Sequence, residues 1–300
     1  MNVHQDSESR QFPLLFCLLG IIVAFAVIVP WISPYDPSAR SERQFSPPSW
    51  EHWGGTDLHG RDVLTRVAYG LRITLLVGIT GATISLMIGV TVGALAGYFG
   101  GWIDNLLMRL VDTLYSLPRL IFVILIITLL DKPTTSLLHE LNLHALLPHA
   151  RILLLFIGLG CVEWLTMARI VRGQVLMIKE LQFIQAARAL GQNHFAILWK
   201  HILPQVRGIV LVYLTLTIPT VMLEESFLSF LGLGVEPPGA SLGTLLSEGA
   251  LMINPVHMNT WLLFIPAITL ASTLCVINFL GDTLRDHFDP RSQQHFFKRA

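Results

Sequence analysis

Six apolar stretches, separated by polar segments, dominate the pattern of this sequence. A helix that crosses the hydrocarbon core of a membrane needs about 20 residues. The apolar positions run continuously and do not alternate with polar ones, which is typical of membrane helices and not of a membrane β-barrel. We therefore predict an all-α integral membrane protein with six transmembrane helices, which lie in or begin in Leu14–Ile32, Ile73–Phe99, Trp102–Leu130, Ile152–Val171, Gly208–Leu223 and Trp261–Leu280.

The first apolar stretch has two interpretations, a retained helix or a cleaved signal peptide. A signal peptide has basic residues before its apolar core and small residues at a cleavage site after it. Here Asp6 and Glu8 offset the single Arg10, and a proline and a tryptophan follow the core. We predict a retained helix, within an N-terminal unit of tail, helix and outer loop over residues 1–70. Residues 71–300 then form a core with five helices.

The outer loop, residues 33–70, is polar and rich in Pro, Gly, Trp and His. Its acidic and basic side chains predict a turn with ion pairs, and we favour a firmly held loop over a ligand site. The pairs would join Asp57 or Asp62 to Arg61 or Arg66.

Three glycines, Gly89, Gly93 and Gly97, recur every four residues in the second apolar stretch. They share one helix face, and such faces let membrane helices pack closely. We favour packing over the alternative that this face lines a substrate path. Gly100 and Gly101 are expected to form the turn that follows.

Charged residues interrupt the third and fourth apolar stretches. Asp112 and Arg119 lie seven residues apart in the third, where Pro118 predicts a kink, and Glu163 lies in the fourth. Ionisable residues inside a membrane are candidates for function. Asp112 and Arg119 would also lie on one side of a helix, so a structural ion pair and a role in a path both stay open.

Two adjacent carboxylates, Glu224 and Glu225, end the fifth stretch. They could hold a cation, relay a proton, lie among lipid headgroups, or accept hydrogen bonds from loop backbone. The residues that follow are too apolar for an ordinary outer loop. We expect Phe227–Leu233 to re-enter the membrane or lie along its surface, and Pro237 and Pro238 to end that segment.

The segment Lys179–Pro204 carries polar residues between two strongly apolar stretches. It predicts two short helices, with Gly191 as the cap of the first, Asn193 as the cap of the second and Pro204 as its end. The second helix has an apolar stripe. A helix that lies on the surface of its own membrane is one interpretation, and a docking element for a partner protein is the other. The stripe consists of Phe195, Leu198, Trp199 and Ile202.

This segment resembles the EAA loop of ABC importer permeases. The resemblance rests on Gln185-Ala186-Ala187, on Gly191, and on His201-Ile202-Leu203-Pro204. The family usually has Glu where this chain has Gln185. In that family the loop forms a coupling helix that docks on the ATP-binding subunit, so the resemblance implies this role for residues 185–187, Gly191, Leu203 and Pro204.

Two further motifs resemble the C-type permease of bacterial oligopeptide and dipeptide importers, which share a type I importer fold. They are Gly55-Thr56-Asp57 with Gly60-Arg61-Asp62, followed by a helix from near Gly70, and the run 224–234. The resemblance implies a permease subunit that forms half of a path for peptides across the bacterial inner membrane. It also implies a second permease, two ATP-binding subunits that carry ATP and Mg²⁺, and an extracytoplasmic peptide-binding protein. Nickel and glutathione importers share the pattern, so the substrate stays open.

Composition agrees with a membrane protein and excludes several functions. Hydrophobic residues make up 53% of the chain and charged residues 13%, against about 25% in soluble domains. No GxxxxGK[ST] phosphate-binding loop occurs, and neither does GxSxG, HExxH or CxxC, so no enzyme motif is present. The net charge is zero, which does not favour a nucleic-acid partner.

Neither cysteines nor histidines predict a metal site. Cys17, Cys161 and Cys275 lie in apolar stretches, where we expect buried free thiols. The histidines at 139, 144 and 149 are five residues apart, and on a helix each such step rotates the side chain by about 140°. No two of them would share a face.

Six spans place both chain ends on one side of the membrane. That side carries twelve of the Lys and Arg residues and the other side seven, so we assign it to the cytoplasm. Two alternatives to an ATP-driven permease stay open. One is a self-contained transporter that uses Asp112, Glu163 or Glu224 as proton sites, although we see no internal repeat between the halves. The other is a membrane scaffold without transport activity.

Overall fold

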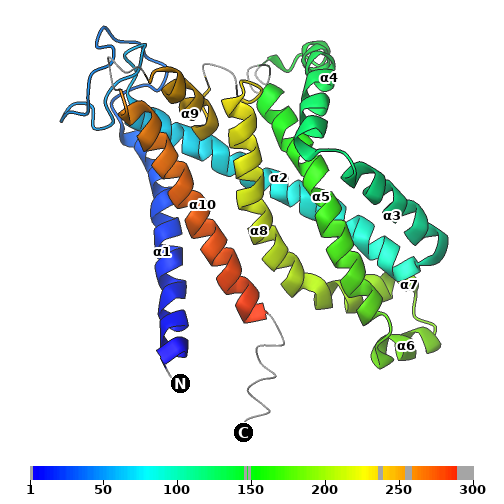
Figure 1. Ribbon diagram of the computed structural model, residues 1–300. Coiled ribbons are helices and arrows are strands. Elements are labelled where there is room, and N and C mark those ends of the chain that lie inside the picture. The colour runs from blue at the N-terminus through cyan, green and yellow to red at the C-terminus, as the bar shows by residue number, and fades with distance from the viewer. Residues whose placement is uncertain (1–2, 145–146, 148–149, 236–238, 254–258, 289–300) are drawn as a thin grey trace.

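The computed structural model describes residues 3–144, 147, 150–235, 239–253 and 259–288. Within these residues the regular structure is helical, and one isolated bridge joins Thr56 to Asp62. The elements, shown in Figure 1, are α1 (Val3–Ile32), α2 (Val63–Phe99), α3 (Gly101–Tyr115), α4 (Arg119–Glu140), α5 (Ala150–Ile178), α6 (Gln182–Ala189), α7 (His194–Ile197), the π-helical turn η2 (Leu198–Ile202), α8 (Leu203–Phe230), α9 (Leu242–Leu251) and α10 (Trp261–Phe288).

Six helices of the described chain are long and apolar enough to cross a membrane, which confirms the predicted number. The segments differ in their ends from the predicted ones, mostly because the helices extend beyond the apolar stretches. They are Pro13–Ile32, Val63–Phe99, Arg119–Glu140, Ala150–Ile178, His194–Phe230 and Trp261–Asp286.

The predicted position of the third span, Trp102–Leu130, is wrong. Proline disfavours helical backbone in the residue before it. The chain breaks at Ser116–Pro118 into two helices, α3 and α4, where a single kinked helix was expected. Of these two helices only α4 qualifies as a span, and it continues through Pro133 to Glu140, beyond the predicted end at Leu130.

The histidines are also placed differently. α4 ends at Glu140, and Asn142 adopts a left-handed conformation with φ 55°. This turn brings the rings of His139 and His144 to 5.4 Å between centroids, because His144 lies beyond the end of α4, where the helical spacing argument does not apply. His149 lies outside the described residues.

α2 begins earlier than predicted, at Val63 and not near Gly70. Asp62 caps it, since one carboxylate oxygen accepts the backbone N–H of Thr65 at 2.8 Å and its hydroxyl at 2.7 Å. The other carboxylate oxygen lies 3.0 Å from Nδ1 of His52. The predicted boundary after residue 70 therefore falls inside a helix.

The closest helix contact joins α2 to α5 through the glycine face that the sequence indicated. A Cβ atom on Gly97 would lie 2.9 Å from the carbonyl oxygen of Arg172, and one on Gly89 would lie 2.9 Å from that of Trp164. Gly93 faces the carbonyl of Ala168 in the same way. These glycines pack α2 on α5, and this contact leaves no room for a path.

The segment after Glu225 begins as a continuation of α8. This helix runs without a break to Phe230 and is capped at Leu231, whereas the prediction for Phe227–Leu233 placed a separate segment there. Pro237 and Pro238 lie outside the described residues. The short helix at this end is α9, which the sequence analysis missed. Its cap is reciprocal, because Thr244 N–H donates to Ser241 Oγ and Ser241 N–H donates to Thr244 Oγ1.

The three cysteines are free, as predicted, but two of them are not buried within the chain. Cys17 and Cys275 are exposed, and Cys161 is partly buried. The last helix continues beyond Leu280 to Phe288, and residues 289–300 lie outside the described part.

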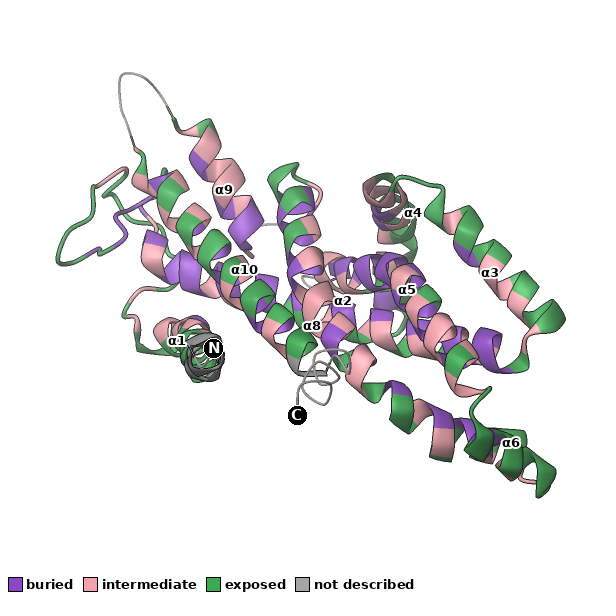
Figure 2. Ribbon diagram, turned by 60° about the horizontal axis from the view of Figure 1, so that its bottom comes forward, coloured by how far each residue is buried: buried purple, intermediate pink, exposed green. Residues whose placement is uncertain are grey.

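The helices form a slanted layer in which α2 crosses from the side of α1 and α10 to the side of α3 (Figure 1). The start of α1, the end of α10 and the segment from α6 to α7 lie at one end. The loop 33–62 and α9 lie at the other end. Buried residues concentrate where α2, α5 and α8 meet, and much of α3 and α6 is exposed (Figure 2).

Adding a methyl group at Gly93 should loosen the contact between α2 and α5. The new Cβ would lie 2.9 Å from Cβ of Val171 and against the carbonyl of Ala168, so one helix must shift. We expect Gly93→Ala to lower the free energy of unfolding by about 1–3 kcal/mol. Gly173→Ala is the matched control, because nothing lies within 4 Å of that site. Thermal unfolding in mild detergent measures both, and equal midpoints would contradict the packing role of Gly93.

Candidate functional site

The segment between α5 and α8 begins with α6 and the cap that the sequence predicted. Gly191 has a φ of 75°, which glycine adopts without strain. The N–H of Gln192 donates to the carbonyl of Ala187 at 3.1 Å and closes the helix end. Asn193 then caps α7, where its side chain accepts the N–H of Phe195 at 3.2 Å.

The helix after this cap does not end at Pro204, contrary to the prediction. α7, η2 and α8 follow one another without a break, and Pro204 lies in the first turn of α8. A proline inside a regular α-helix clashes with the carbonyl four residues earlier. The wider π turn of η2 precedes Pro204, which lets the helix continue into the fifth span.

Buried side chains and two polar contacts join this segment to the end of α2. Ile184 and Ile197 are fully buried and belong to the same apolar cluster as Tyr98. The hydroxyl of Tyr98 lies 2.9 Å from Nδ1 of His194. Lys179 donates to the carbonyl of Gly97 at 2.9 Å, a favourable place for a cation at a helix C-terminus.

The predicted apolar stripe divides between core and surface. Leu198 and Ile202 are buried, whereas Phe195 is 60% and Trp199 69% exposed. Gln185 and Ala186 are also exposed, and Ala187 is partly buried. An exposed surface of large apolar side chains remains at this end, which we call the docking face; it consists of Leu181, Phe183, Leu190, Phe195 and Trp199.

A second group of polar residues lies along α5. Arg172 donates to Asp104 of α3 at 2.6 Å, and Arg169 donates to Asp112 at 2.7 Å. Glu163, about two and a half turns from Arg172, accepts from Arg119 at 3.1 Å. With a rise of 1.5 Å per residue these pairs extend over about 14 Å of the helix.

The ion pair between Asp112 and Arg119, one of the two alternatives that the sequence left open, is therefore not formed. The break at Pro118 places the two side chains on separate helices, where each finds a partner on α5. Tyr115 lies between them, with its hydroxyl 3.1 Å from Nη2 of Arg119 and its ring 4.0 Å from the guanidinium carbon of Arg169. Cation–π contacts of this kind further fix the arginine.

The adjacent carboxylates of α8 have different surroundings. Glu225 is fully buried and accepts from the hydroxyls of Ser229 at 2.6 Å and Thr74 at 3.0 Å. Thr74 in turn accepts the first N–H of α9, that of Leu242, at 3.2 Å. Glu225 thus joins α2, α8 and α9. Glu224 points elsewhere, and its Oε2 is buried without a hydrogen-bond partner among the described residues.

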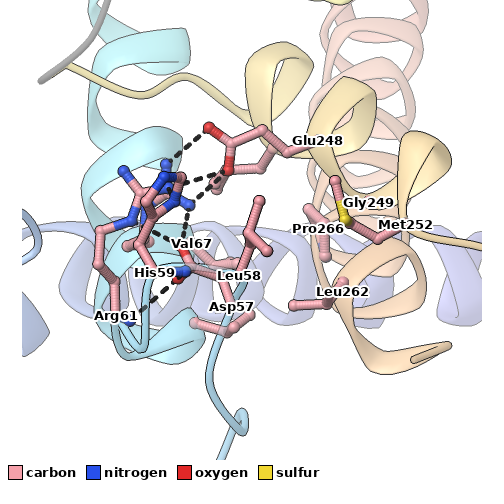
Figure 3. A pocket seen from close by; sticks show the side chains of 13 residues that line it. Asp57, Leu58, His59, Arg61, Val67, Glu248, Gly249, Met252, Leu262 and Pro266 are labelled. Carbon is pink, nitrogen blue, oxygen red and sulfur yellow. Dashed lines mark hydrogen bonds and ion pairs between the residues drawn. The ribbon is translucent and has the colours of Figure 1, made fainter. Parts of the chain in front are cut away.

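The outer loop is held to α2 and α9 by a four-residue ionic network around a cavity of about 120 Å³. Asp57 accepts from Nε of Arg61 at 2.6 Å and from Nη1 of Arg66 at 2.7 Å, which confirms the predicted pairing for Asp57. Arg66 also donates to Glu248 of α9 at 2.6 Å. Figure 3 shows Glu248 facing the loop across this network. Glu248 was missed because α9 itself was not predicted.

Asp57 is a carboxylate that the fold keeps ionised. Burial raises its pKa, but the backbone N–H of Arg61 and the guanidinium of Arg66 favour the charged form more strongly, so its pKa lies below the ordinary value. No group of three or more potential metal ligands occurs among the described residues.

Comparison with known proteins identifies the family. Residues 89–294 match the family described as binding-protein-dependent transport system inner membrane component. The chain belongs to this family. The permease is 43% identical to the oligopeptide transport system permease protein of Haemophilus influenzae, over 97% of this chain and 90% of that protein. It is 42% identical to the dipeptide transport system permease protein of Bacillus subtilis, over 92% of this chain and 80% of that protein.

Solved structures support the fold. The permease matches a chain of the inward-facing MetNI methionine ABC transporter with a TM-score of 0.53 and 22% identity, over 75% of this chain and 96% of that chain. This agrees with the predicted type I importer fold. The family is the non-catalytic membrane component of its transporters, in agreement with the absence of enzyme motifs in the sequence.

The outer network of the permease should lose stability in acid because of Asp57. Its folded pKa is lower than its unfolded value of about 3.9, so its contribution is complete above that value and is lost as the pH falls through the folded pKa. We expect Asp57→Asn to cost about 1–3 kcal/mol at pH 7, and the difference from the unmodified protein to narrow toward pH 3.

Thermal unfolding of both proteins at a series of pH values measures this difference. Glu42→Gln is the control, because Glu42 is an exposed carboxylate of the same loop. A difference for Asp57→Asn that stays constant from pH 7 to pH 3 would contradict the role of its charge.

Proposed function

We propose that this permease forms half of the translocation path of an ATP-driven importer for oligopeptides or dipeptides. The observation that carries the proposal is the identity of 36–43% to peptide transport permeases, most of it over more than nine tenths of the chain. The six spans and the type I importer fold agree with it. The chain has no GxxxxGK[ST] motif, so ATP must act on a separate subunit.

The partners we propose are a second permease, two ATP-binding subunits that hold ATP and Mg²⁺, and an extracytoplasmic peptide-binding protein. The docking face supports an ATP-binding partner, because its residues Leu181, Phe183 and Leu190 lie outside the candidate spans and large exposed apolar side chains there need a cover. It lies at the same end as the start of α1 and the end of α10 (Figure 1). We therefore place this end and both termini in the cytoplasm.

We propose that α6 and the turn after it couple the permease to the ATP-binding subunit. Gln185, Ala186 and Ala187 would contact the partner, since two of them are exposed and all three are short or flexible. Gly191 shapes the turn, and residues 203–204 begin α8, the main helix of the fifth span. The contacts of Tyr98 and Lys179 would pass movement of α6 to α2, so that closure of the ATP-binding subunits tilts the spans.

The charged side chains of α3, α4, α5 and α8 separate into two proposed roles. Glu225 is structural, because its partners enclose it completely. Asp112 is 67% exposed and Arg119 40% exposed on the surface of this chain, and lipid is an unfavourable neighbour for both. We assign this face, with Glu163 and Glu224, to the contact with the second permease and to the path between the two.

The family match also bears on the two units of the chain. We propose that α1 and the outer loop, within residues 1–70, are an accessory unit on the permease core of residues 71–300. The matched region, 89–294, supports a core that does not need α1. α1 packs only on α2 and α10 among the strongest contacts of the described chain.

The assembly can be tested by purifying the tagged chain from its native membrane in mild detergent and identifying the co-purifying proteins by mass spectrometry. We expect a second permease and two ATP-binding subunits. Recovery of the chain alone, from a preparation in which other membrane complexes stay intact, would exclude this assembly. ATP-dependent uptake of tripeptides by the reconstituted complex then tests the substrate.

Gly191→Pro should uncouple transport without preventing insertion. Proline cannot adopt a φ of 75° and has no N–H to donate to Arg188, so the turn must change. Strain of about 1–3 kcal/mol at this turn should lower ATP-dependent uptake about tenfold or more. Gly191→Asn is the control, because asparagine tolerates this conformation. Uptake by Gly191→Pro at the unmodified rate would contradict the coupling role.

A further inference from the structure

A groove of about 430 Å³ lies between α4, α8, α9 and α10 on the face assigned to the path. Its volume is within the range of about 300–1,000 Å³ that is usual for small-molecule sites. Its walls are apolar apart from one carboxylate and one hydroxyl. The lining residues are Leu120, Leu223, Glu224, Ser226, Phe227, Phe230, Leu246 and Leu270.

Glu224, the carboxylate of the groove, has one oxygen to which no neighbouring side chain among the described residues donates a hydrogen bond. Oε2 of Glu224 is buried and accepts no hydrogen bond within the described chain. The nearby Arg119 is already bonded to Glu163 at 3.1 Å and to Tyr115 at 3.1 Å. A buried carboxylate oxygen without a donor is costly, so this atom calls for an explanation.

The charged groups near the groove include more carboxylates than guanidinium groups. Glu224 lies within electrostatic range of Glu163 and Arg119, which makes two carboxylates and one guanidinium. Glu225, the next residue, provides the contrast, because hydroxyl groups from two helices satisfy it and it does not line the groove. The negative excess therefore belongs to the groove and not to the bundle around it.

We propose that this groove is a binding subsite in the translocation path for a primary ammonium group carried beside an apolar side chain. Glu224 would accept from the ammonium, and the apolar part would lie against Phe227 and Phe230. A protonated peptide N-terminus with its first side chain has this chemistry, and so has a lysine side chain. The inference rests on the proposed function for its place in a transport cycle, but its binding chemistry can be tested separately.

The test measures binding of two small probes to the purified complex, with all co-purifying subunits, in lipid nanodiscs. Phenylalanine amide presents an ammonium group beside an aromatic ring, and N-acetyl-phenylalanine amide lacks the charge. We expect the first to bind at least about tenfold more tightly, and Glu224→Gln to remove this preference. Glu224→Asp, which keeps the charge, should retain most of it.

N-acetyl-lysine amide, which carries its ammonium on the side chain, separates the two sources. Weak binding of this probe assigns the subsite to the peptide N-terminus, and tight binding admits lysine side chains as well. Equal binding of charged and neutral probes by the unmodified complex would overturn the inference. So would loss of the second permease from the Glu224→Gln complex, because Glu224 would then be a contact between subunits.

The same complex, reconstituted both in nanodiscs for binding and in closed vesicles for uptake, distinguishes this inference from the proposed function. A complex that prefers the ammonium probe but shows no ATP-dependent uptake of tripeptides after reconstitution keeps the subsite and refutes peptide import. A complex that imports tripeptides without any ammonium preference refutes the subsite alone.

Discussion

Close backbone contact between α2 and α5 is the interaction on which the rest of this permease depends. Lipid is as apolar as the helix surfaces, so the hydrophobic effect does little to hold membrane helices together, and van der Waals contact must do so. Glycines at 89, 93 and 97 bring the two backbones together over about 12 Å of α2. The packing of α2 on α5 also positions Glu163, Arg169 and Arg172 of α5, which form ion pairs with α3 and α4.

The length of α2 gives this contact a functional consequence. It is 37 residues long and has no proline inside it. At one end Tyr98 and the carbonyl of Gly97 hold the segment that we assign to the ATP-binding subunit. At the other end Asp62 and Arg66 hold the outer loop and α9. A rigid helix anchored at both ends is suited to carry a movement across the membrane, which is what an importer with an external motor requires.

The ion pairs of this chain lie in two different surroundings. The outer network is enclosed by protein and satisfies its members, as the lowered pKa of Asp57 reflects. The pairs of α5 with Asp112 and Arg119 are partly exposed on the single chain. This contrast separates charges that hold the fold from charges that we assign to the contact with a second permease. Glu224 and Glu225 show the same contrast between neighbours in sequence.

Hydrophobicity and local chemistry determined much of this protein from sequence alone. The number of spans, the glycine face, the caps at Gly191 and Asn193 and the pairing of Asp57 follow from residues near one another in the chain. Only the tertiary structure decided that Pro118 separates two helices, that Pro204 does not end one, and that Asp112 and Arg119 find partners on α5. The physical reason is that a proline restricts the local backbone and a charge requires a partner. Whether the helix breaks at the proline, and which residue pairs with the charge, depend on the helices that pack beside them.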